Sequence, residues 1–153
     1  MKLNCSACGG SGRFGCGMIL RDHQGAILFS SCRELQACQD DLEAILHAIR
    51  EGVQISINRE QTAITIECSS ISAIKLLEDP ETCRSIYSLL VSEIKVLLSS
   101  LDTFSLTFIN SCRPSTLLAK LDLSESKTSV WLGSGPMPVV DACNLDLPSV
   151  RAE

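Results

Sequence analysis

Aromatic side chains are scarce in this sequence of 153 residues, which contains one Trp, one Tyr and four Phe. Proteins that hold single-stranded nucleic acid stack its bases on aromatic rings, and so few rings offer little material for such a platform. Positive charge is also in deficit, because 13 Lys and Arg stand against 18 Asp and Glu, for a formal net charge of -5. The molecule as a whole therefore repels a polyanion, and nucleic-acid binding requires a local basic groove or a bound metal.

Long hydrophobic runs and targeting segments are missing as well. No apolar stretch approaches the roughly 18 residues of a membrane helix, since Glu93 and Lys95 interrupt the most hydrophobic region. A strand-like alternation begins with the first residues, which leaves no room for a signal peptide ahead of it. These features predict a soluble protein with no membrane partner, located inside the cell in the cytoplasm or nucleus.

A zinc-binding pattern is incomplete, although the chain has nine cysteines. Cys5 and Cys8 form a C-x-x-C, but no second pair follows at zinc-ligand spacing, and strand residues three apart face opposite sides. An odd number of cysteines without a secretory segment favours reduced thiols. We therefore expect free thiols and no zinc.

The first third of the chain alternates polar and apolar residues with a period of two. Residues 2–7, 14–20 and 26–30 each show this pattern, and the turn-forming segment 22–25 separates the last two. Such alternation is typical of half-buried strands joined by short turns. The pattern predicts an antiparallel meander of three strands.

The period then changes to that of a helix, with apolar residues at Leu42, Ile45, Leu46, Ile49 and Val53. Gly52, near the end of this pattern, is interpreted as a helix stop. Residues 63–67 and 104–108 predict two more strands, and short helices are expected around residues 71–77 and 117–121. Between them, Asp79 and Pro80 predict the start of a helix whose buried stripe is Ile86, Leu90, Ile94 and Leu97.

The order of these elements predicts a single α/β domain over residues 1–125, with a mixed sheet and crossover connections. Residues 126–153, rich in glycine and proline, are interpreted as a C-terminal tail that packs on the domain or extends from it. No internal repeat stands out.

Two features resemble binding or catalytic motifs, but the sequence around them argues against both interpretations. Residues 10–15 fit G-x-G-x-x-G, yet a dinucleotide site needs a helix to begin within the motif, and residues 14–20 alternate as a strand. A hairpin loop is the better interpretation. His23, in a turn, and His47, on the polar side of the helix, lack a nucleophile beside them, so both are interpreted as solvated.

Several segments carry a more specific pattern in a fixed order. They are Lys2-Leu3-Asn4, residues 17–25 (GMILRDHQG), residues 42–46 (LEAIL), residues 66–70 (IECSS), residues 118–120 (LAK) and residues 130–132 (VWL). Together they resemble the plant ribonuclease H-like domain of retroelement-derived reverse transcriptases and of short stand-alone proteins. The resemblance extends from Lys2 to about Leu147, and implies a five-stranded sheet ordered 3-2-1-4-5.

The resemblance also implies where catalytic residues belong. In active members of that family, four carboxylates hold two magnesium ions, about 4 Å apart, that cut the RNA of an RNA–DNA hybrid. Laid on this sequence, the four positions fall on Ser6, Glu43, Ser69 and Thr116. Three of them are neutral hydroxyls, and a single carboxylate offers one negative charge against two ions carrying four positive charges. Glu67, two residues before Ser69, lies too far along its strand to replace the missing ligand.

These positions predict a catalytically inactive ribonuclease H-like domain that needs no cofactor and binds nucleic acid, as RNA–DNA hybrid or RNA, or a protein partner. Two alternatives stay open. One is a magnesium-dependent hybrid ribonuclease with atypical ligands, and the other is a retroelement-derived relic without selected activity. The acidic charge and the few aromatic rings favour a protein partner, whereas the family favours nucleic acid.

Overall fold

The alternating segments of the first third form the centre of a mixed β-sheet. The structure, a computed structural model, describes residues 1–10, 13–81, 84–121 and 129–146. Their elements are, in chain order, β1 (Lys2–Gly10), β2 (Arg13–Arg21), β3 (Ile27–Leu35), α1 (Asp41–Asn58), β4 (Ala63–Cys68), α2 (Ile71–Glu78), α3 (Ser88–Ser99), β5 (Thr103–Phe108), α4 (Arg113–Ala119), β6 (Ser129–Leu132) and α5 (Met137–Asp146).

The strand order of the described sheet is β5-β4-β1-β2-β3-β6. The first three strands form the expected antiparallel meander, and β4 joins β1 in parallel, with Leu3 beside Ile66. The predicted order 3-2-1-4-5 is therefore confirmed. A sixth strand, β6, was not expected, and it extends the sheet by pairing antiparallel with β3.

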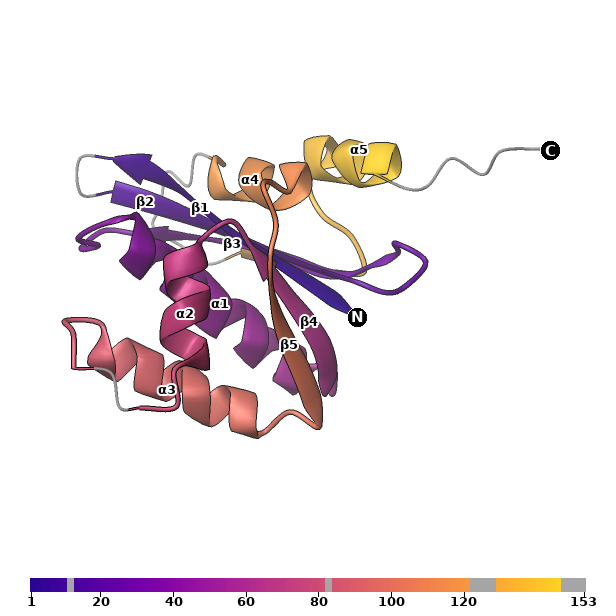
Figure 1. Cartoon of the computed structure of the whole chain (residues 1–153). Coiled ribbons are helices and arrows are strands. Elements are labelled where there is room, and N and C mark those ends of the chain that lie inside the picture. The colour runs from indigo at the N-terminus through magenta and orange to yellow at the C-terminus, as the bar shows by residue number, and fades with distance from the viewer. Residues whose placement is uncertain (11–12, 82–83, 122–128, 147–153) are drawn as a thin grey trace.

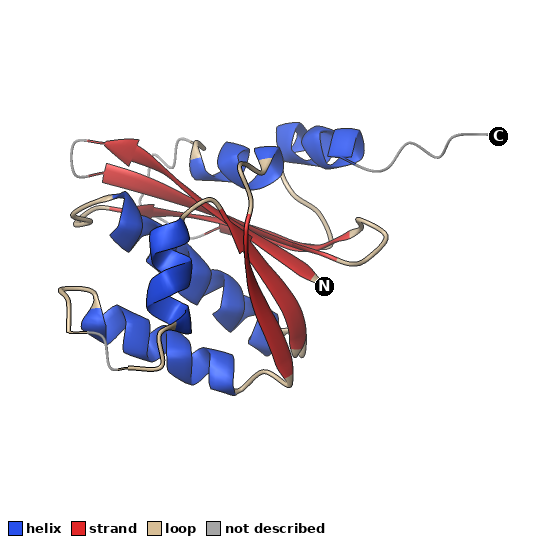
Figure 2. Ribbon diagram, in the orientation of Figure 1, coloured by secondary structure: helices blue, strands red, loops and turns tan. Residues whose placement is uncertain are grey.

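Helices cover both faces of this sheet, as Figures 1 and 2 show. α1, α2 and α3 lie on one face, and α4 and α5 lie on the other. Alternate residues of each strand supply the two cores, because successive side chains point to opposite faces. The larger core includes Leu3, Met18 and Ile66, and the smaller one includes Ile19 and Leu118. None of the described helices combines the length and the apolarity needed to cross a bilayer.

The glycine-rich segment 10–15 joins two strands, as expected. Gly10 ends β1, and Phe14 and Gly15 already belong to β2. Residues 11 and 12 lie outside the described part of the chain. Since Phe14 and Gly15 are in a strand, no helix N-terminus is available there for a pyrophosphate, and the hairpin interpretation is confirmed.

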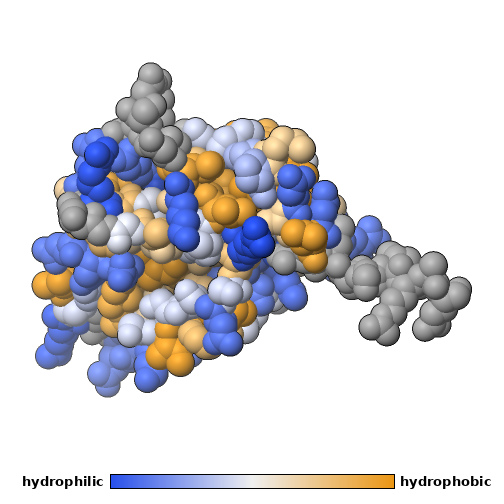
Figure 3. Space-filling model, turned by 90° about the horizontal axis from the view of Figure 1, so that it is seen from above, coloured by the Kyte–Doolittle hydropathy of each residue, from blue (hydrophilic) through white to orange (hydrophobic). Residues whose placement is uncertain are grey.

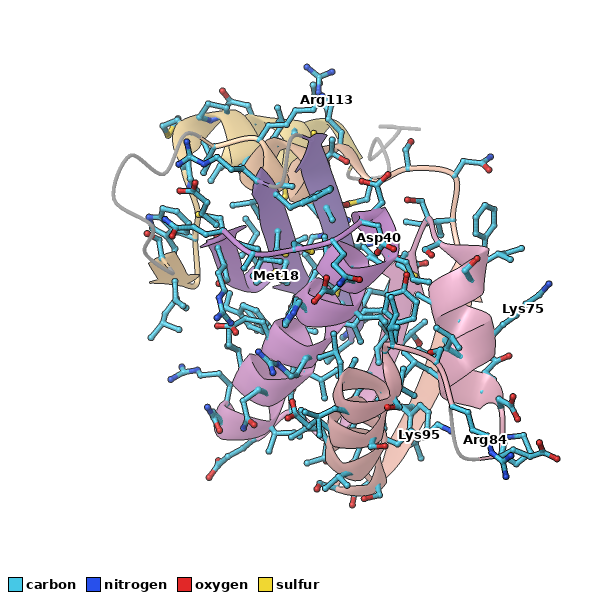
Figure 4. All side chains as sticks on the ribbon, turned by 90° about the vertical axis from the view of Figure 1, so that its left-hand side faces the viewer. Met18, Asp40, Lys75, Arg84, Lys95 and Arg113 are labelled. Carbon is cyan, nitrogen blue, oxygen red and sulfur yellow. The ribbon has the colours of Figure 1, made fainter. Side chains whose placement is uncertain are left out.

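Helix α1 continues past Gly52, so the expected stop at that residue is wrong. A Cβ atom on Gly52 would lie 3.0 Å from Leu3 Cδ1 and 3.3 Å from Met18 Cγ. The glycine therefore lets α1 approach the sheet closely instead of ending the helix; Met18 is labelled in Figure 4. The helix ends at Asn58, and Glu60 just beyond it has a left-handed backbone with φ 61°.

The expected helix start at Pro80 is also wrong, because α3 begins at Ser88. Asp79 is the residue after α2, and its side chain accepts the backbone N–H of Glu81 at 2.9 Å. The carboxylate that was expected to cap α3 therefore stabilises a turn. The buried stripe of α3 is Val91, Ile94 and Leu98, whereas Ile86 is 74% exposed.

Helix α4 lies directly on the backbone of β2. A Cβ atom on Gly15 would be 1.9 Å from the carbonyl oxygen of Ala119, and one on Gly17 would be 2.0 Å from that of Ser115. Any side chain at these positions would push the helix away from the sheet. The two glycines thus set the distance between α4 and the central strands.

Part of the predicted tail joins the sheet and the helical layer that packs on it. Residues 129–132 form β6, and α5 packs its Val139 and Cys143 into the smaller core. Glycine and proline had suggested a tail that packs on the domain or extends from it, and in the structure Gly133 provides a turn with φ 69° and Pro136 precedes α5. The boundary predicted between residues 125 and 126 falls in segment 122–128, outside the described residues.

Candidate functional site

A pocket lies where β1 and β4 end and where α1 and α2 begin. Its volume is about 640 Å³, and we call it the end-of-strand pocket. β1 and α1 supply six of its lining residues, which are Ala7, Cys8, Gly9, Asp41, Leu42 and Ile45. The segment after β4 supplies the other four, which are Ser69, Ser70, Ile71 and Ser72. The parallel pairing of β1 with β4 brings these two chain segments to one edge of the sheet.

The polar groups of this pocket are mostly hydroxyls. Of its ten lining residues, three are serines and one, Asp41, is a carboxylate on the exposed side of α1. The Ser70 hydroxyl already caps α2 by accepting the backbone N–H of Ala73 at 3.2 Å. The predicted position Ser69 is therefore in the pocket, but it is accompanied by weak, neutral donors and by aliphatic side chains.

The predicted position Ser6 lies on β1 and faces α4. Its hydroxyl oxygen is 2.6 Å from that of Ser115, which is fully buried. Thr116, the position predicted from the resemblance, is the next residue and is half-buried in the first turn of α4. Ser115 was not predicted, because the resemblance assigns the position to Thr116. Only the rotation of α4 about its axis shows that the Ser115 hydroxyl is the one that contacts β1.

The fourth predicted position, Glu43, turns its carboxylate away from the pocket. Its Oε2 accepts the backbone N–H of Gln39 at 2.6 Å, and its Oε1 lies 3.9 Å from His47 Nε2. Ile45, two residues further along α1, lines the pocket instead. The structure thus brings Ser69 close to an aliphatic side chain, not to Glu43.

The N-terminus of α1 is fixed by a carboxylate that the sequence reasoning missed. Asp40 caps the helix by accepting the backbone N–H of Glu43 at 2.9 Å, and it also accepts a short hydrogen bond from the Tyr87 hydroxyl. Figure 4 shows Asp40 at this end of the helix. The bond from Tyr87, followed by the capping bond, lowers the pKa of Asp40, and the same contact raises the pKa of Tyr87 to about 12. Asp40 is therefore held as an ionised structural cap.

His47 is half-buried, which corrects its interpretation as a solvated residue. Its Nδ1 atom is buried and has no hydrogen-bond partner among the described residues. Burial lowers the pKa of His47, and the nearby Arg50 guanidinium lowers it further. The imidazole therefore favours its neutral form, although Glu43 lies near its other nitrogen.

Asn4 and Glu67 form a second polar contact across the strands. The Asn4 amide is almost fully buried, and its Nδ2 donates to Glu67 Oε1 at 3.0 Å. Arg21 Nη2 donates to Asn4 Oδ1 at 3.3 Å. Glu67 is thus engaged in holding a buried amide, and it does not stand in for the ligand missing at Ser69.

The eight cysteines within the described residues are free. Cys5 is buried, and burial, more than its neighbouring thiols, raises the pKa of its thiol well above the usual value. Cys8, the other member of the C-x-x-C, instead lines the end-of-strand pocket. The absence of a zinc site stays a prediction.

Magnesium, which the resemblance implies, does not fit the residues present. It prefers several anionic oxygen ligands in octahedral geometry, and the end-of-strand pocket supplies one carboxylate. Across the described ranges, no three His, Cys, Asp or Glu side chains lie together as a metal site. The chemistry of the donors therefore disagrees with a two-metal centre.

Comparisons with known proteins agree with this fold. The ribonuclease H1 of Halobacterium salinarum superimposes with a TM-score of 0.72 at 14% identity, covering 81% of this chain and 97% of that one. The N-terminal ribonuclease H domain of a Mycobacterium tuberculosis protein, solved as a fusion with maltose-binding protein, gives 0.66 at 16% identity, covering 78% and 96%. The LC11 ribonuclease H1, solved in complex with an RNA/DNA hybrid, gives 0.67 at 9% identity, covering 77% and 92%.

At the level of sequence, no curated protein matches the chain. A family model described as reverse transcriptase-like does match, over residues 4–120. This span runs from the first strand to the end of α4, and so it includes every element that borders the end-of-strand pocket. With its α/β ribonuclease H-like fold, the chain belongs to the reverse transcriptase-like family.

Proposed function

We propose that this chain is a ribonuclease H-like domain that does not cleave RNA–DNA hybrids and that acts by binding another macromolecule, a protein in preference to a nucleic acid. The observation that carries the proposal is the set of donors at the end-of-strand pocket. Of the four positions implied by the resemblance, Ser69 lines this pocket, together with other serine hydroxyls, aliphatic side chains and one exposed carboxylate. Ser6 lies against Ser115 under α4, and Glu43 accepts the backbone N–H of Gln39, so no carboxylates cluster at these positions.

Electrostatics explains why such a set does not support two-metal chemistry. Two magnesium ions bring four positive charges, and their mutual repulsion must be offset by anionic ligands. Asp41 offers one negative charge, and the Glu43 carboxylate is turned toward Gln39 and His47. Ser6 and Ser115 share one hydrogen bond, in which either hydroxyl can be the donor, so even their hydroxyls are partly occupied.

The arginines favour a protein partner over nucleic acid. Arg13, Arg33 and Arg50 each pair with a glutamate, at 2.5, 3.1 and 2.8 Å. A cation that is neutralised by a neighbour contributes less to phosphate binding, and the net charge of -5 opposes a polyanion. Figure 3 shows the face seen from above, where hydrophilic and hydrophobic residues are mixed.

The inactivity is tested by a magnesium titration followed by NMR. We expect no saturable shift of the backbone amides of Ser6, Ser69 or Thr116 in millimolar magnesium, because no anionic ligand set surrounds them. Saturable shifts confined to these residues would overturn the proposal of an empty, non-catalytic site. The amide of Asp102, which lies near the end of α3 and away from the pocket, is the internal control.

The choice of partner is tested by fluorescence anisotropy with a labelled RNA–DNA hybrid. We expect weak binding that disappears at physiological salt, as non-specific phosphate contacts do. Saturable binding that persists at that salt would contradict the preference for a protein and would identify the domain as a nucleic-acid-binding module.

A further inference from the structure

The outermost strand β5 has an exposed edge with an unusual composition. It is the last strand on its side of the described sheet and pairs with β4 alone. Its sequence, TFSLTF, contains no charge and no proline, and its register with β4 runs without a bulge. Edge strands are normally protected against pairing with another chain by charges, prolines or bulges. β5 has none of these devices.

The hydrogen bonds to β4 show which backbone groups of β5 point outward. The N–H of Thr103 donates to Thr62 at 3.2 Å, and that of Ile109 donates to Cys68 at 2.9 Å. In a parallel pair, alternate residues direct both backbone groups to the same neighbour. The odd-numbered residues of β5 therefore face β4, and Phe104, Leu106 and Phe108 direct their N–H and C=O groups away from the sheet.

The side chains of the same three residues form an apolar row. They pair with Ile64, Ile66 and Cys68 of β4, which are buried, and so they lie on the face that carries α2 and α3. Phe104 and Phe108 are 44% and 45% exposed, and Leu106 between them packs partly on the core. The row is apolar, and its two outer members are the same residue type.

We propose that β5 is a self-association edge, which pairs antiparallel with β5 of a second copy of this chain about a two-fold axis through Leu106. In this register Leu106 meets its own copy, and Phe104 meets Phe108 of the second molecule. These are the residues whose backbone groups point outward, so each opposing pair exchanges two hydrogen bonds. On the other face, Ser105 meets Thr107, and the two sheets become one continuous sheet.

The side chains on both faces of the paired strands favour this register. Residues directly opposite each other in an antiparallel pair share a face, so a shift by one residue would set Phe against Ser or Thr. Aromatic pairs across strands stabilise a sheet, whereas no like charges meet at this edge. A six-residue strand pair buries less than the roughly 1,200 Å² of a stable interface. We therefore expect a weak dimer that dissociates on dilution.

This inference does not depend on the end-of-strand pocket, because β5 shares no residue with it. It is tested by sedimentation velocity of the full chain from low micromolar to near-millimolar concentration. We expect the mass to rise toward that of a dimer, and Phe104→Lys or Phe108→Glu alone to abolish the rise. Val130→Lys, at an equally exposed (45%) residue of the opposite edge strand β6, is the matched control and should leave it unchanged.

Combining Phe104→Lys with Phe108→Glu reports the register. In the proposed pairing the introduced lysine of one molecule faces the introduced glutamate of the other, so the double variant should regain part of the dimer that each single variant loses. Circular dichroism verifies that all variants are folded. A mass that stays monomeric at the highest concentration, or a dimer that Val130→Lys abolishes and Phe104→Lys does not, would overturn the proposal.

Discussion

The hydroxyl oxygens of Ser6 and Ser115 lie 2.6 Å apart and connect the first strand of the chain to helix α4. The Ser115 hydroxyl also donates to the Cys112 carbonyl oxygen at 3.3 Å. The contact lies under α4, where the helix backbone rests on Gly17. A neutral hydrogen bond therefore occupies the region in which the fold family implies two carboxylates and metal.

The Ser6–Ser115 contact should be measurable as a coupling in a double-mutant cycle. Ser115→Ala leaves the Ser6 hydroxyl without this partner, and we expect it to lower the free energy of unfolding by about 1 kcal/mol. The double variant Ser6→Ala with Ser115→Ala should cost less than the sum of the two single changes. Chemical denaturation measures all four proteins, and strict additivity would show that the hydroxyls are not coupled.

Close packing of α4 on the sheet predicts a large effect of one methyl group. Gly17→Ala places a Cβ 2.0 Å from the Ser115 carbonyl oxygen, closer than any real contact of a Cβ atom. The helix must move, and overpacking of this kind typically costs about 1–3 kcal/mol. Thermal denaturation compares Gly17→Ala with Ala63→Gly, the reverse change at an exposed position on β4, which measures the effect of exchanging glycine and alanine in a strand without a clash. An unchanged Gly17→Ala protein would contradict the close approach of α4.

Much of the fold follows from local patterns, whereas the errors arise where tertiary contacts decide. The alternation of residues 14–20 identified a strand in spite of the G-x-G-x-x-G motif. A glycine at position 52 is compatible with a helix end and also with a close approach of the helix to Leu3. Only the packing of α1 on the sheet distinguishes these two roles. Asp79 and Pro80 form a valid cap signal, but α3 begins where Tyr87 reaches Asp40, a contact between distant residues.

At the candidate site, too, the sequence predicts the strands correctly, whereas tertiary contacts decide which side chains meet. The resemblance put candidate positions at Ser6, within β1, and at Ser69, just after β4, and the order of these strands was predicted correctly. The family pattern over residues 42–46 assigned the helix position to Glu43. The rotation of α1 on the sheet, which a sequence without coordinates does not reveal, places Ile45 in the pocket and Glu43 beside His47.

His47 predicts a pH dependence of stability. Burial lowers its pKa in the folded chain, so below about pH 6.5 the unfolded chain binds the proton more readily. The free energy of unfolding should therefore fall as the pH drops through the window from 6.5 to the lowered pKa. We expect His47→Gln to flatten this slope and His23→Gln, in an exposed turn, to leave it intact. Equal slopes for the two variants in urea denaturation would contradict a buried, neutral His47.

Rebuilding the carboxylates should create a magnesium site only if the helix ligand is placed correctly. We expect the combination Ser6→Asp, Ile45→Glu, Ser69→Asp and Thr116→Asp to show a melting temperature that rises with magnesium. The matched protein that keeps Ile45 and relies on Glu43 should respond less. Both should be less stable than the unmodified chain without metal, because clustered carboxylates repel one another. A stronger response from the protein that keeps Ile45 would show that Glu43 reaches the site after all.

Cleavage of an RNA–DNA hybrid shows whether the end-of-strand pocket and the residues around it support two-metal catalysis. The measurement uses hybrid labelled on the RNA strand, with magnesium or manganese, and compares the unmodified chain with Glu43→Gln and with Asp41→Asn. We expect all three proteins to give the same cleavage as buffer alone. Cleavage by the unmodified chain that either substitution abolishes would contradict this expectation.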